Sequence, residues 1–341
     1  MSGKIYICLN CGNDATRKEI AYMDAALERG KRTSEKTLRF KSPLHKRIKS
    51  YGSLYMIALP GIIFLIVFKY LPMYGIIISF KDFNVVKGIL GSDWIGLDNF
   101  RTLFSTSDFP IALKNTLILS FYHLVWGFPV PIILALLLNE IRLHLFKRTV
   151  QTITYIPHFF SWVVISGIFI DLLSPSTGIV NSFLQLLGID PVYFMADTRF
   201  IRSILVFSNI WKEAGWGTII YLASITSIDQ ELYKAAAIDG AGRFRQTLSV
   251  TIPSLKSTII ILLIMRLGNI MDGNFEQVLM MYSAPVYNVT DVIDTYVYRQ
   301  SFVTLQFGLT SAAGLFKAVI NCTLLLVSDG IVKRLGGTGM Y

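Results

Sequence analysis

The stretch Tyr233-Lys-Ala-Ala-Ala-Ile-Asp-Gly-Ala-Gly-Arg243, followed by Thr251-Ile-Pro253, lies between two apolar segments of a strongly hydrophobic chain. Three consecutive alanines, Ala235 to Ala237, predict a short helix with a side-chain-poor face that can approach a partner's backbone closely. Asp239-Gly240 predicts the turn that ends this helix, because glycine tolerates a positive φ. A second short amphipathic stretch follows, and Pro253 suits the first turn of the next membrane helix. These features predict a compact loop shaped to dock on another protein.

The composition predicts a membrane protein. Hydrophobic residues make up 53% of the 341 residues and charged residues only 16%, far from the balance of a soluble globular domain. Apolar runs near the length needed to cross a bilayer recur along the chain. The first of them holds Lys69 and two prolines, so it is either strongly tilted or continues outside the membrane. We predict an all-α polytopic fold with about six transmembrane spans: Tyr51–Phe80, Ile111–Leu138, Val150–Leu173, Phe200–Ile225, Ser254–Met271 and Gly308–Val332.

The distribution of Lys and Arg predicts the orientation of these spans. Basic residues are dense in residues 1–50, in the loops after the second and fourth spans, and behind the last span. The positive-inside rule then places both termini and the loop at residues 229–253 in the cytoplasm. The net charge of +10 follows from this topology, so no nucleic-acid binding is predicted. We divide the chain into a basic cytoplasmic extension, residues 1–50, and a transmembrane domain, residues 51–341.

No catalytic or metal site is predicted. Cys8 and Cys11 have the C-x-x-C spacing of half a zinc ribbon, but no second pair supplies the four ligands of a closed site. The alternatives are half a metal site or two reduced thiols. The histidines are scattered without ligand spacing, and no G-x-x-x-x-G-K-[ST] loop could cradle ATP phosphates. No cleavable signal peptide is expected, because the first apolar segment starts near residue 51 and is too long. We therefore expect no enzymatic activity in this chain and an energy source in a bound partner.

Several stretches resemble the permease subunits of binding-protein-dependent ABC importers, in the oligosaccharide branch related to maltose and lipoprotein-type polysaccharide permeases. The coupling loop of that family has the form E-A-A, three residues, then Gly, with a later I-x-L-P. Residues 233–240 and 250–253 match it. Residues 94–104 resemble the family's extracytoplasmic G-L-x-N-F stretch, and residues 275–278 and 291–296 also look like this group. The resemblance covers roughly residues 50 to 341.

The resemblance implies a type I ABC importer permease fold and a set of partners. A companion permease would complete a heterodimer in the bacterial cell membrane, and two ATPase subunits would bind ATP and Mg²⁺, leaving this chain without a cofactor of its own. A sugar-binding protein would dock outside on the loops around Lys81–Pro110 and Met271–Gln306. The substrate would be an oligosaccharide.

Within the coupling loop, residues 229–253, the resemblance implies contact with the ATPase through Glu231, Lys234, Ala235, Ala236, Asp239, Gly240, Ala241, Gly242 and Pro253. The family usually has Glu where this sequence has Lys234. Glu231 lies three residues earlier and would share a helix face with Lys234, so it could supply a replacement carboxylate. Alternatively, the ATPase of this importer differs at that spot, or the companion permease carries the stronger contact.

The fourth span supplies the first candidate residues of a substrate pathway. Polar groups are costly in lipid and usually face a cavity or a partner helix. Asn209, Lys212, Glu213 and Trp216 recur at i, i+3, i+4 and i+7, so they share one helix face. By resemblance, this segment is the substrate-contacting part of the family's span, where polar groups meet sugar hydroxyls and an aromatic ring covers the sugar. Alternatively, Lys212 and Glu213 neutralise the helix interior or bind water near the outer surface.

The fifth span adds Asn269, Asp272 and Asn274, at near-helical spacing behind Arg266. The corresponding span of the family lines the pathway with Asn residues. Arg266 could equally be the structural partner of a buried carboxylate.

The third span adds His158, Ser161 and Trp162, which align with another pathway-lining segment of the family. Pro157 precedes them and frees a backbone carbonyl. A lone histidine inside a span could instead be a helix-packing group.

Three other functional classes fit the sequence less well than an importer does. An ion-gradient-driven secondary transporter is the main alternative, but it should show paired inverted halves with membrane-buried carboxylates, and we find none. A membrane enzyme would need converging catalytic groups, and a scaffold would not need the polar stripe of the fourth span. The aromatic and charged lining favours a complex oligosaccharide, branched or bearing uronic acids, because Lys212 and Arg266 would suit an acidic sugar.

Overall fold

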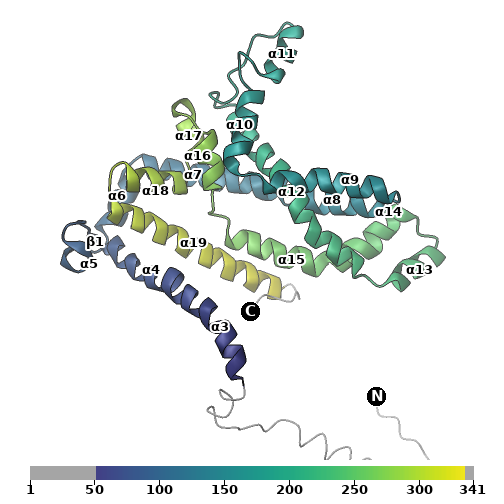
Figure 1. The fold of residues 1–341 in the computed structure, drawn as a ribbon, viewed down its shortest axis with the longest axis horizontal. Coiled ribbons are helices and arrows are strands. Elements are labelled where there is room, and N and C mark those ends of the chain that lie inside the picture. Colours follow the sequence, from purple (N-terminus) through teal and green to yellow (C-terminus); the bar gives the residue numbers. More distant parts are fainter. Residues whose placement is uncertain (1–50, 335–341) are drawn as a thin grey trace, which may run out of the picture. The chain divides into compact units, whose positions relative to one another are not determined.

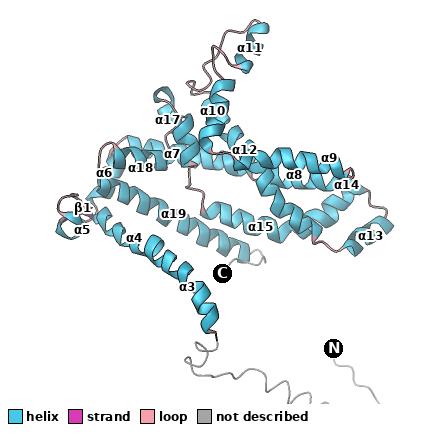
Figure 2. Ribbon diagram, in the orientation of Figure 1, coloured by secondary structure: helices cyan, strands magenta, loops and turns pink. Residues whose placement is uncertain are grey.

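The computed structural model describes residues 51–334, so the basic extension and the Cys8–Cys11 pair lie outside the described residues. The described chain is helical except for its connecting loops and two very short strands (Figure 2). It divides into two units, one that ends at Pro72 and one that starts at Met73.

The first unit is an apolar helical rod. It contains α3 (Gly52–Leu65), the π-helical turn η1 (Ile66–Tyr70) and the start of α4 (Leu71–Met73). Apart from two glycines, one serine and Pro60, α3 consists of Leu, Ile, Ala, Tyr, Met and Phe. A helix that is apolar on all sides is typical of a membrane span.

The second unit joins long helical segments through shorter ones (Figure 1). The long segments are α7 (Asp108–Tyr122) with η3 (His123–Gly127) and α8 (Pro129–Glu140); α9 (His144–Tyr155) with η4 (Ile156–Phe159), then α10 (Trp162–Leu172); α12 (Ile201–Thr226); α14 (Arg243–Gln246) with η5 (Thr247–Thr251) and α15 (Ile252–Gly268); and α19 (Phe307–Arg334). The shorter helices are η2 (Tyr74–Phe80), α5 (Gly88–Gly91), α6 (Asp98–Ser105), α11 (Ile179–Leu186), α13 (Gln230–Ile238), α16 (Phe275–Met281), η6 (Ala284–Val286), α17 (Tyr287–Thr290) and α18 (Ile293–Phe302). Strands β1 (Lys81–Asp82) and β2 (Asp93–Trp94) form an antiparallel pair.

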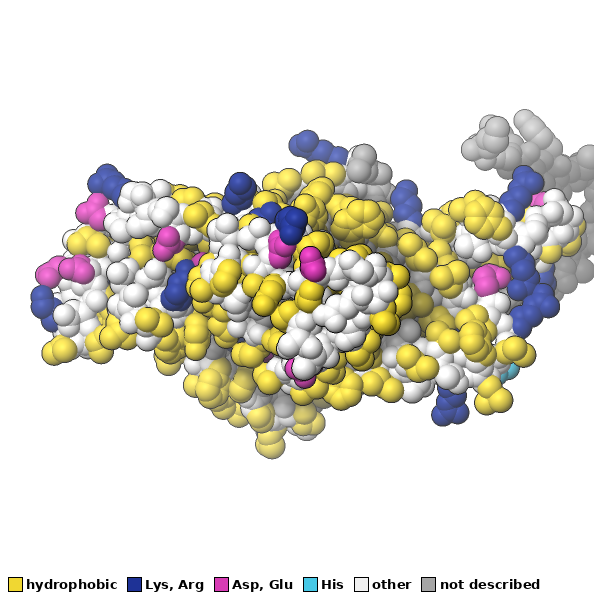
Figure 3. Space-filling model, turned by 90° about the horizontal axis from the view of Figure 1, so that it is seen from above, with side chains coloured by type: hydrophobic (Ala, Val, Ile, Leu, Met, Phe, Trp, Pro, Cys, Tyr) yellow, Lys and Arg dark blue, Asp and Glu magenta, His cyan; other side chains and the backbone are white. Residues whose placement is uncertain are grey.

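All the predicted spans are helical, but they are not equally apolar. Among residues 51–334, four helical segments are long and apolar enough to cross a membrane: Gly52–Phe80, Asp108–Glu140, Arg243–Gly268 and Phe307–Arg334. The α9–α10 pair makes a fifth if it counts as one span. The helix α12 has 26 residues and sufficient length, but its polar residues keep it outside that set. Hydrophobic side chains cover broad areas of the visible surface, as lipid-facing helices require (Figure 3).

Two predicted spans differ from the structure. The third is not one helix over Val150–Leu173, because the chain bends by 105° between Phe159 and Trp162. The fifth does not begin at Ser254. Its helix starts at Arg243 and ends at Gly268, so the second amphipathic stretch of the coupling loop, α14 and η5, is the beginning of the span itself.

Prolines explain the widened turns inside these helices. Each π-helical turn, η1, η3 and η5, ends two residues before a proline: Pro72, Pro129 and Pro253. A proline cannot donate to the carbonyl four residues earlier, and its ring collides with that carbonyl in a regular α-helix. The extra residue of a π turn moves the carbonyl aside, so the helix continues through the proline.

Helix α12 is the centre of the packing of α8, α9 and α15. This helix contacts α8 on one side and α9 on another, and α15 lies along α19 (Figure 1). Gly215 permits the contact with α9, because a Cβ added there would lie 2.0 Å from the Thr154 carbonyl oxygen. One buried cluster joins α8, α12 and α15 through residues such as Leu138, Leu222 and Leu255. Close approach at small residues is typical of helix packing in membranes.

The structure explains why glycine and asparagine stand in the G-L-x-N-F stretch, residues 96–100. Gly96 adopts a φ of +63°, which glycine accepts without strain. The Asn99 side-chain amide donates hydrogen bonds of 3.0 Å to the carbonyl oxygens of Ser79 and Lys81. Asn99 therefore fastens α6 to the end of η2, beside the β1–β2 pair.

Candidate functional site

The coupling loop is built from local backbone geometry. Asp229 begins α13 and its carboxylate accepts a hydrogen bond from the Glu231 amide at 2.9 Å. The helix ends at a Schellman motif: the Gly240 amide donates to Ala237 O, and the Ala241 amide donates to Ala236 O. Gly240 has a φ of +77°. The helix and turn predicted from the alanines and Asp239-Gly240 are confirmed, and Gly242 begins the next helix.

Side-chain contacts fasten this loop to the membrane helices. Tyr233 Oη lies 2.9 Å from Thr251 Oγ1, which joins α13 to η5. Arg243 on α14 pairs with Glu140 at the end of α8, at 3.3 Å. A polar pocket of ≈ 420 Å³ lies between these elements. The loop is thus held in a defined position while Ala235 and Ala237 on α13 stay exposed.

Lys234 and Glu231 share a helix face, as the sequence predicts. Their charged groups form an exposed ion pair of 2.8 Å. The carboxylate that could replace the family's Glu is therefore present at this face, one turn earlier along α13. Its contact with an ATPase stays a prediction.

A cavity of ≈ 360 Å³ lies within the helices of the second unit. Predicted pathway residues from three separate segments line it: Trp162, Asn209, Glu213, Trp216 and Asn274. Arg266 lines it as well. Residues that sequence reasoning did not select complete the wall, and they are mostly glycine, proline and apolar residues: Gly127, Phe128, Pro131, Ile210, Ala214, Gly217, Ile220, Tyr221 and Leu262. No motif marks these residues, since they join the cavity only through packing.

Lys212 does not line the cavity. Its side chain is buried, and its ammonium donates hydrogen bonds to the carbonyl oxygens of His158 at 2.7 Å and Phe160 at 2.9 Å. These carbonyls lie at the 105° bend between η4 and α10, where regular helical hydrogen bonding is interrupted. The ammonium also lies 5.6 Å from the Trp162 ring centroid. The geometry makes Lys212 the group that secures this bend.

His158 and Glu213 form a second connection between the same helices. Their Nδ1 and Oε2 atoms lie 3.0 Å apart, and the His158 ring stacks on Trp216 with centroids separated by 4.5 Å. The Glu213 carboxylate also lies 3.7 Å from the Lys212 ammonium. His158 therefore orients two cavity-lining side chains without lining the cavity itself. Ser161 lies at the bend too, where its hydroxyl accepts a hydrogen bond from the Val164 amide.

The predicted helical face behind Arg266 is wrong, because α15 ends at Gly268. Asn269 follows the helix end and is exposed, and Asp272 lies in the turn beyond it. Asn274 adopts a left-handed φ of 49° and points its amide to within 3.2 Å of His123 Nδ1. Only Asn274 of the three lines the ≈ 360 Å³ cavity.

Asp272 belongs to a charge cluster with Lys317 of α19. The Lys317 ammonium lies 2.8 Å from Asp272 and 2.7 Å from Asp294. A second cavity of ≈ 530 Å³ lies beside this cluster, and aromatic residues including Phe275 and Tyr298 line it. The ammonium joins α18, α19 and the turn after α15.

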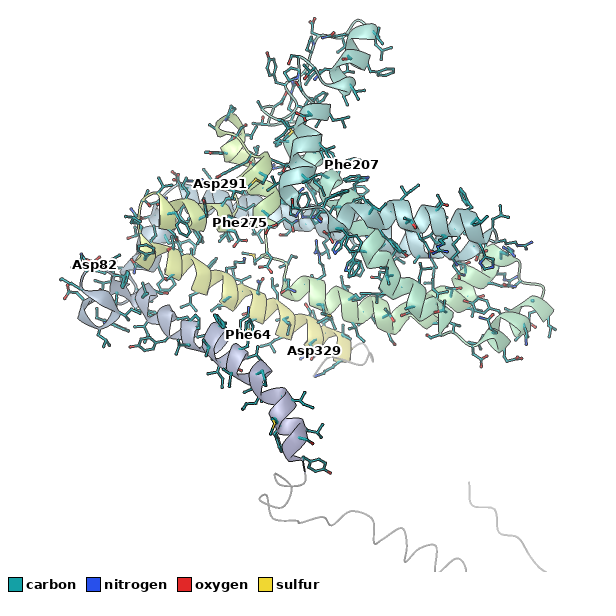
Figure 4. All side chains as sticks on the ribbon, in the orientation of Figure 1. Phe64, Asp82, Phe207, Phe275, Asp291 and Asp329 are labelled. Atoms are coloured by element: carbon teal, nitrogen blue, oxygen red, sulfur yellow. The ribbon has the colours of Figure 1, made fainter. Side chains whose placement is uncertain are left out.

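The segments predicted to lie outside the membrane are fixed by buried polar contacts. Arg202 donates to Val289 O and to the Asn115 side chain, which itself donates to Asp291 O. Asp291, labelled in Figure 4, pairs with Arg299 at 2.6 Å. The hydrogen bonds to Asp291 raise the pKa of Arg299, so this cation stays charged.

This chain matches a known protein family and several known transport proteins. Residues 127–337 match the family described as binding-protein-dependent transport system inner membrane component. The polygalacturonan/rhamnogalacturonan transport system permease protein YteP of Bacillus subtilis (strain 168) is 44% identical over 288 residues, which is 84% of this chain and 90% of that protein.

Two solved structures are also similar to this chain. One chain of a bacterial alginate ABC transporter, in complex with alginate pentasaccharide-bound periplasmic protein, is 41% identical with a TM-score of 0.81, covering 87% of this chain and 99% of its own. A chain of a bacterial ABC transporter involved in the import of the acidic polysaccharide alginate is 42% identical with a TM-score of 0.80, covering 85% and 98%. These matches confirm the resemblance and the type I permease fold.

Proposed function

We propose a function for this chain from one premise: it belongs to the family of binding-protein-dependent transport system inner membrane components. It is the transmembrane subunit of an ATP-driven oligosaccharide importer and forms half of the translocation pathway. It lies in the bacterial cell membrane with both termini in the cytoplasm. A companion permease forms the other half, two ATPase subunits bind ATP and Mg²⁺, and an extracytoplasmic binding protein delivers the sugar.

The geometry of α13 supports this function most directly. A helix that presents small, exposed side chains and is anchored at both ends can transmit a push without bending. Asp229 and the Schellman motif fix its ends, while Tyr233 and Arg243 fasten the loop to η5 and α8. Movement imposed on α13 by an ATPase would therefore reach the helices that line the cavity.

The mechanism is alternating access. ATP-driven closure of the ATPase subunits draws the two coupling loops together, and the helices turn the cavity outward to receive the sugar from the binding protein. Hydrolysis resets the cavity toward the cytoplasm. Only contacts that differ between the two states can shift this equilibrium, so the lever must be rigid.

The transported sugar is an acidic oligosaccharide. Two similar proteins carry names that refer to polygalacturonan/rhamnogalacturonan and to the acidic polysaccharide alginate. The cavity supports this substrate class, because its wall combines tryptophans, side-chain amides and the cation Arg266, while its one carboxylate, Glu213, lies 3.7 Å from the Lys212 ammonium. Aromatic faces cover sugar rings, and polar groups bind hydroxyls and carboxylates.

Reconstitution tests the proposal. The chain is placed in vesicles with its companion permease, ATPase and binding protein, and uptake of oligogalacturonide is measured with and without ATP. We expect uptake that requires ATP and every partner. Uptake without the ATPase would overturn the proposal and favour an ion-driven transporter. Labelling of a cysteine placed at residue 237 by an impermeant reagent from outside intact cells would also overturn the topology.

A further inference from the structure

We infer that Arg266 binds the carboxylate of the transported sugar and sets the preference of the cavity for acidic over uncharged oligosaccharides. This inference rests on the proposed function and names the residue that carries its substrate class. It separates Arg266 from Lys212, the other cation that the sequence offers for an acidic sugar.

The structure leaves Arg266 as the available cation. The Lys212 ammonium is buried and satisfied by the carbonyl oxygens of His158 and Phe160. In contrast, the Arg266 guanidinium has no hydrogen-bond or ion-pair partner within residues 51–334, and it lines the ≈ 360 Å³ cavity. A guanidinium offers five donors in a planar fork that matches a carboxylate. A cation in a membrane span without a partner in the described chain indicates a functional site.

The nearby carboxylates are already paired with other cations. Glu213 and Asp272 are the acidic groups that act electrostatically on Arg266. Glu213 lies 3.0 Å from His158 and 3.7 Å from Lys212, while Asp272 lies 2.8 Å from Lys317. Neither carboxylate reaches the Arg266 guanidinium at ion-pair distance, so an arriving anion does not have to displace one.

The cavity wall supplies the remaining contacts that a uronic acid needs. Asn209 and Asn274 offer amides for hydroxyl groups, and Trp162 and Trp216 offer aromatic surface for the sugar ring. His158 covers one face of Trp216 at 4.5 Å, yet 46% of Trp216 remains exposed. The Glu213 carboxylate also lines the cavity, but it lies beside His158 and the Lys212 ammonium. The lining cation Arg266 distinguishes a carboxylate from its uncharged ester, because only the carboxylate can form a charge-assisted, bidentate contact.

Equilibrium binding to the purified importer, assembled with its companion permease and ATPase but without the binding protein, tests this inference. The probes are radiolabelled trigalacturonate and its full methyl ester, which differ in charge but keep the same sugar skeleton. We expect the wild-type importer to bind the acid about 30-fold more tightly than the ester, as charge-assisted hydrogen bonds predict.

Two variants at the same position decide the outcome. Arg266→Gln should remove most of this preference while leaving the affinity for the ester within about threefold, since Gln keeps polarity and loses charge. Arg266→Lys should keep an intermediate preference, because it retains the charge without the fork. An unchanged acid-to-ester ratio in Arg266→Gln would overturn the assignment even if the importer transports oligogalacturonide normally. A wild-type importer that transports no acidic probe would instead reject the proposed function.

Discussion

The coupling loop and the membrane cavity achieve their shapes in opposite ways. The loop is local: its cap and its Schellman bonds join residues at most five positions apart, and most of its side chains are exposed. The cavity depends on contacts between distant parts of the chain. The Lys212 ammonium, which secures the bend beside it, donates hydrogen bonds to carbonyl oxygens 54 and 52 residues earlier in the sequence. A lever needs a fixed backbone, whereas a binding site needs side chains brought together from several helices.

The same contrast appears in two glycines. Gly240 has a positive φ of 77°, and a Cβ added there would meet nothing within 4 Å. Gly215 has ordinary helical geometry, but a Cβ there would lie 2.0 Å from the Thr154 carbonyl oxygen. The loop therefore uses glycine for its backbone freedom, and the membrane region uses it for close packing. Substitutions that affect only one of these properties can test the comparison.

The largest effect is expected for Gly240→Pro. Proline requires a φ near −65° and cannot donate the hydrogen bond that Gly240 makes to Ala237 O. We expect oligosaccharide uptake and substrate-stimulated ATP hydrolysis to fall at least about 100-fold, because the loop loses its rigid end. The binding protein should still dock outside. Gly240→Asn is the control, since Asn tolerates the left-handed region, and it should keep uptake within about threefold. Normal uptake by the proline variant would reject the lever.

Lys212→Met should give the next largest effect. It removes the two hydrogen bonds at the bend of the third span and leaves the carbonyls of His158 and Phe160 without this donor. We expect a loss of stability of about 3 kcal/mol and a fall in uptake of about tenfold. Thermal unfolding of the purified complex and vesicle uptake measure the two effects. The exposed Lys256→Met is the matched control and should change neither. A stable Lys212→Met variant with lowered sugar affinity would show that Lys212 binds substrate directly.

Gly215→Ala should destabilise the protein through sterics alone. The added methyl group forces α9 and α12 apart, which costs about 1–3 kcal/mol as in other overpacked sites. A lower midpoint of thermal unfolding is the expected result. Gly167→Ala on α10 is the control, because a Cβ there meets nothing within 4 Å. Equal midpoints for the two variants would contradict the close contact between α9 and α12.

The smallest effect is expected for Lys234→Glu. Its ion pair with Glu231 is exposed on both sides, and such pairs contribute only a few tenths of a kcal/mol. Because the helix and its end do not depend on this pair, ATPase activity of the complex should stay within about twofold. Lys234→Gln is the control, because it removes the positive charge without introducing a negative one. A tenfold loss in the Glu variant alone would place Lys234 against an acidic partner on the ATPase.

Sequence reasoning succeeded where the signal is local. The alanines and Asp239-Gly240 predicted α13 and its turn, and the apolar runs located the long helices of residues 51–334, with errors at the third and fifth spans. It failed where a helix ends or bends through packing. The face drawn from Arg266 to Asn274 does not exist, because α15 stops at Gly268 and Asn274 turns back toward His123. Lys212 shares a helix face with Asn209, yet its ammonium turns to the bend of α9–α10, which no periodicity could reveal.

The sequence by itself determined that this chain is a helical membrane protein and predicted a small cytoplasmic lever, because hydropathy, charge bias and turn chemistry act over short segments. Its motifs also pointed to the importer family that the comparisons show. Only the tertiary structure decided which polar residues form the cavity and which brace it. Lys212 and Arg266 are both cations in predicted membrane spans, and their neighbours in the folded bundle distinguish them. Two backbone carbonyls satisfy the first and leave it structural, while the second faces an open cavity without a partner in the described chain.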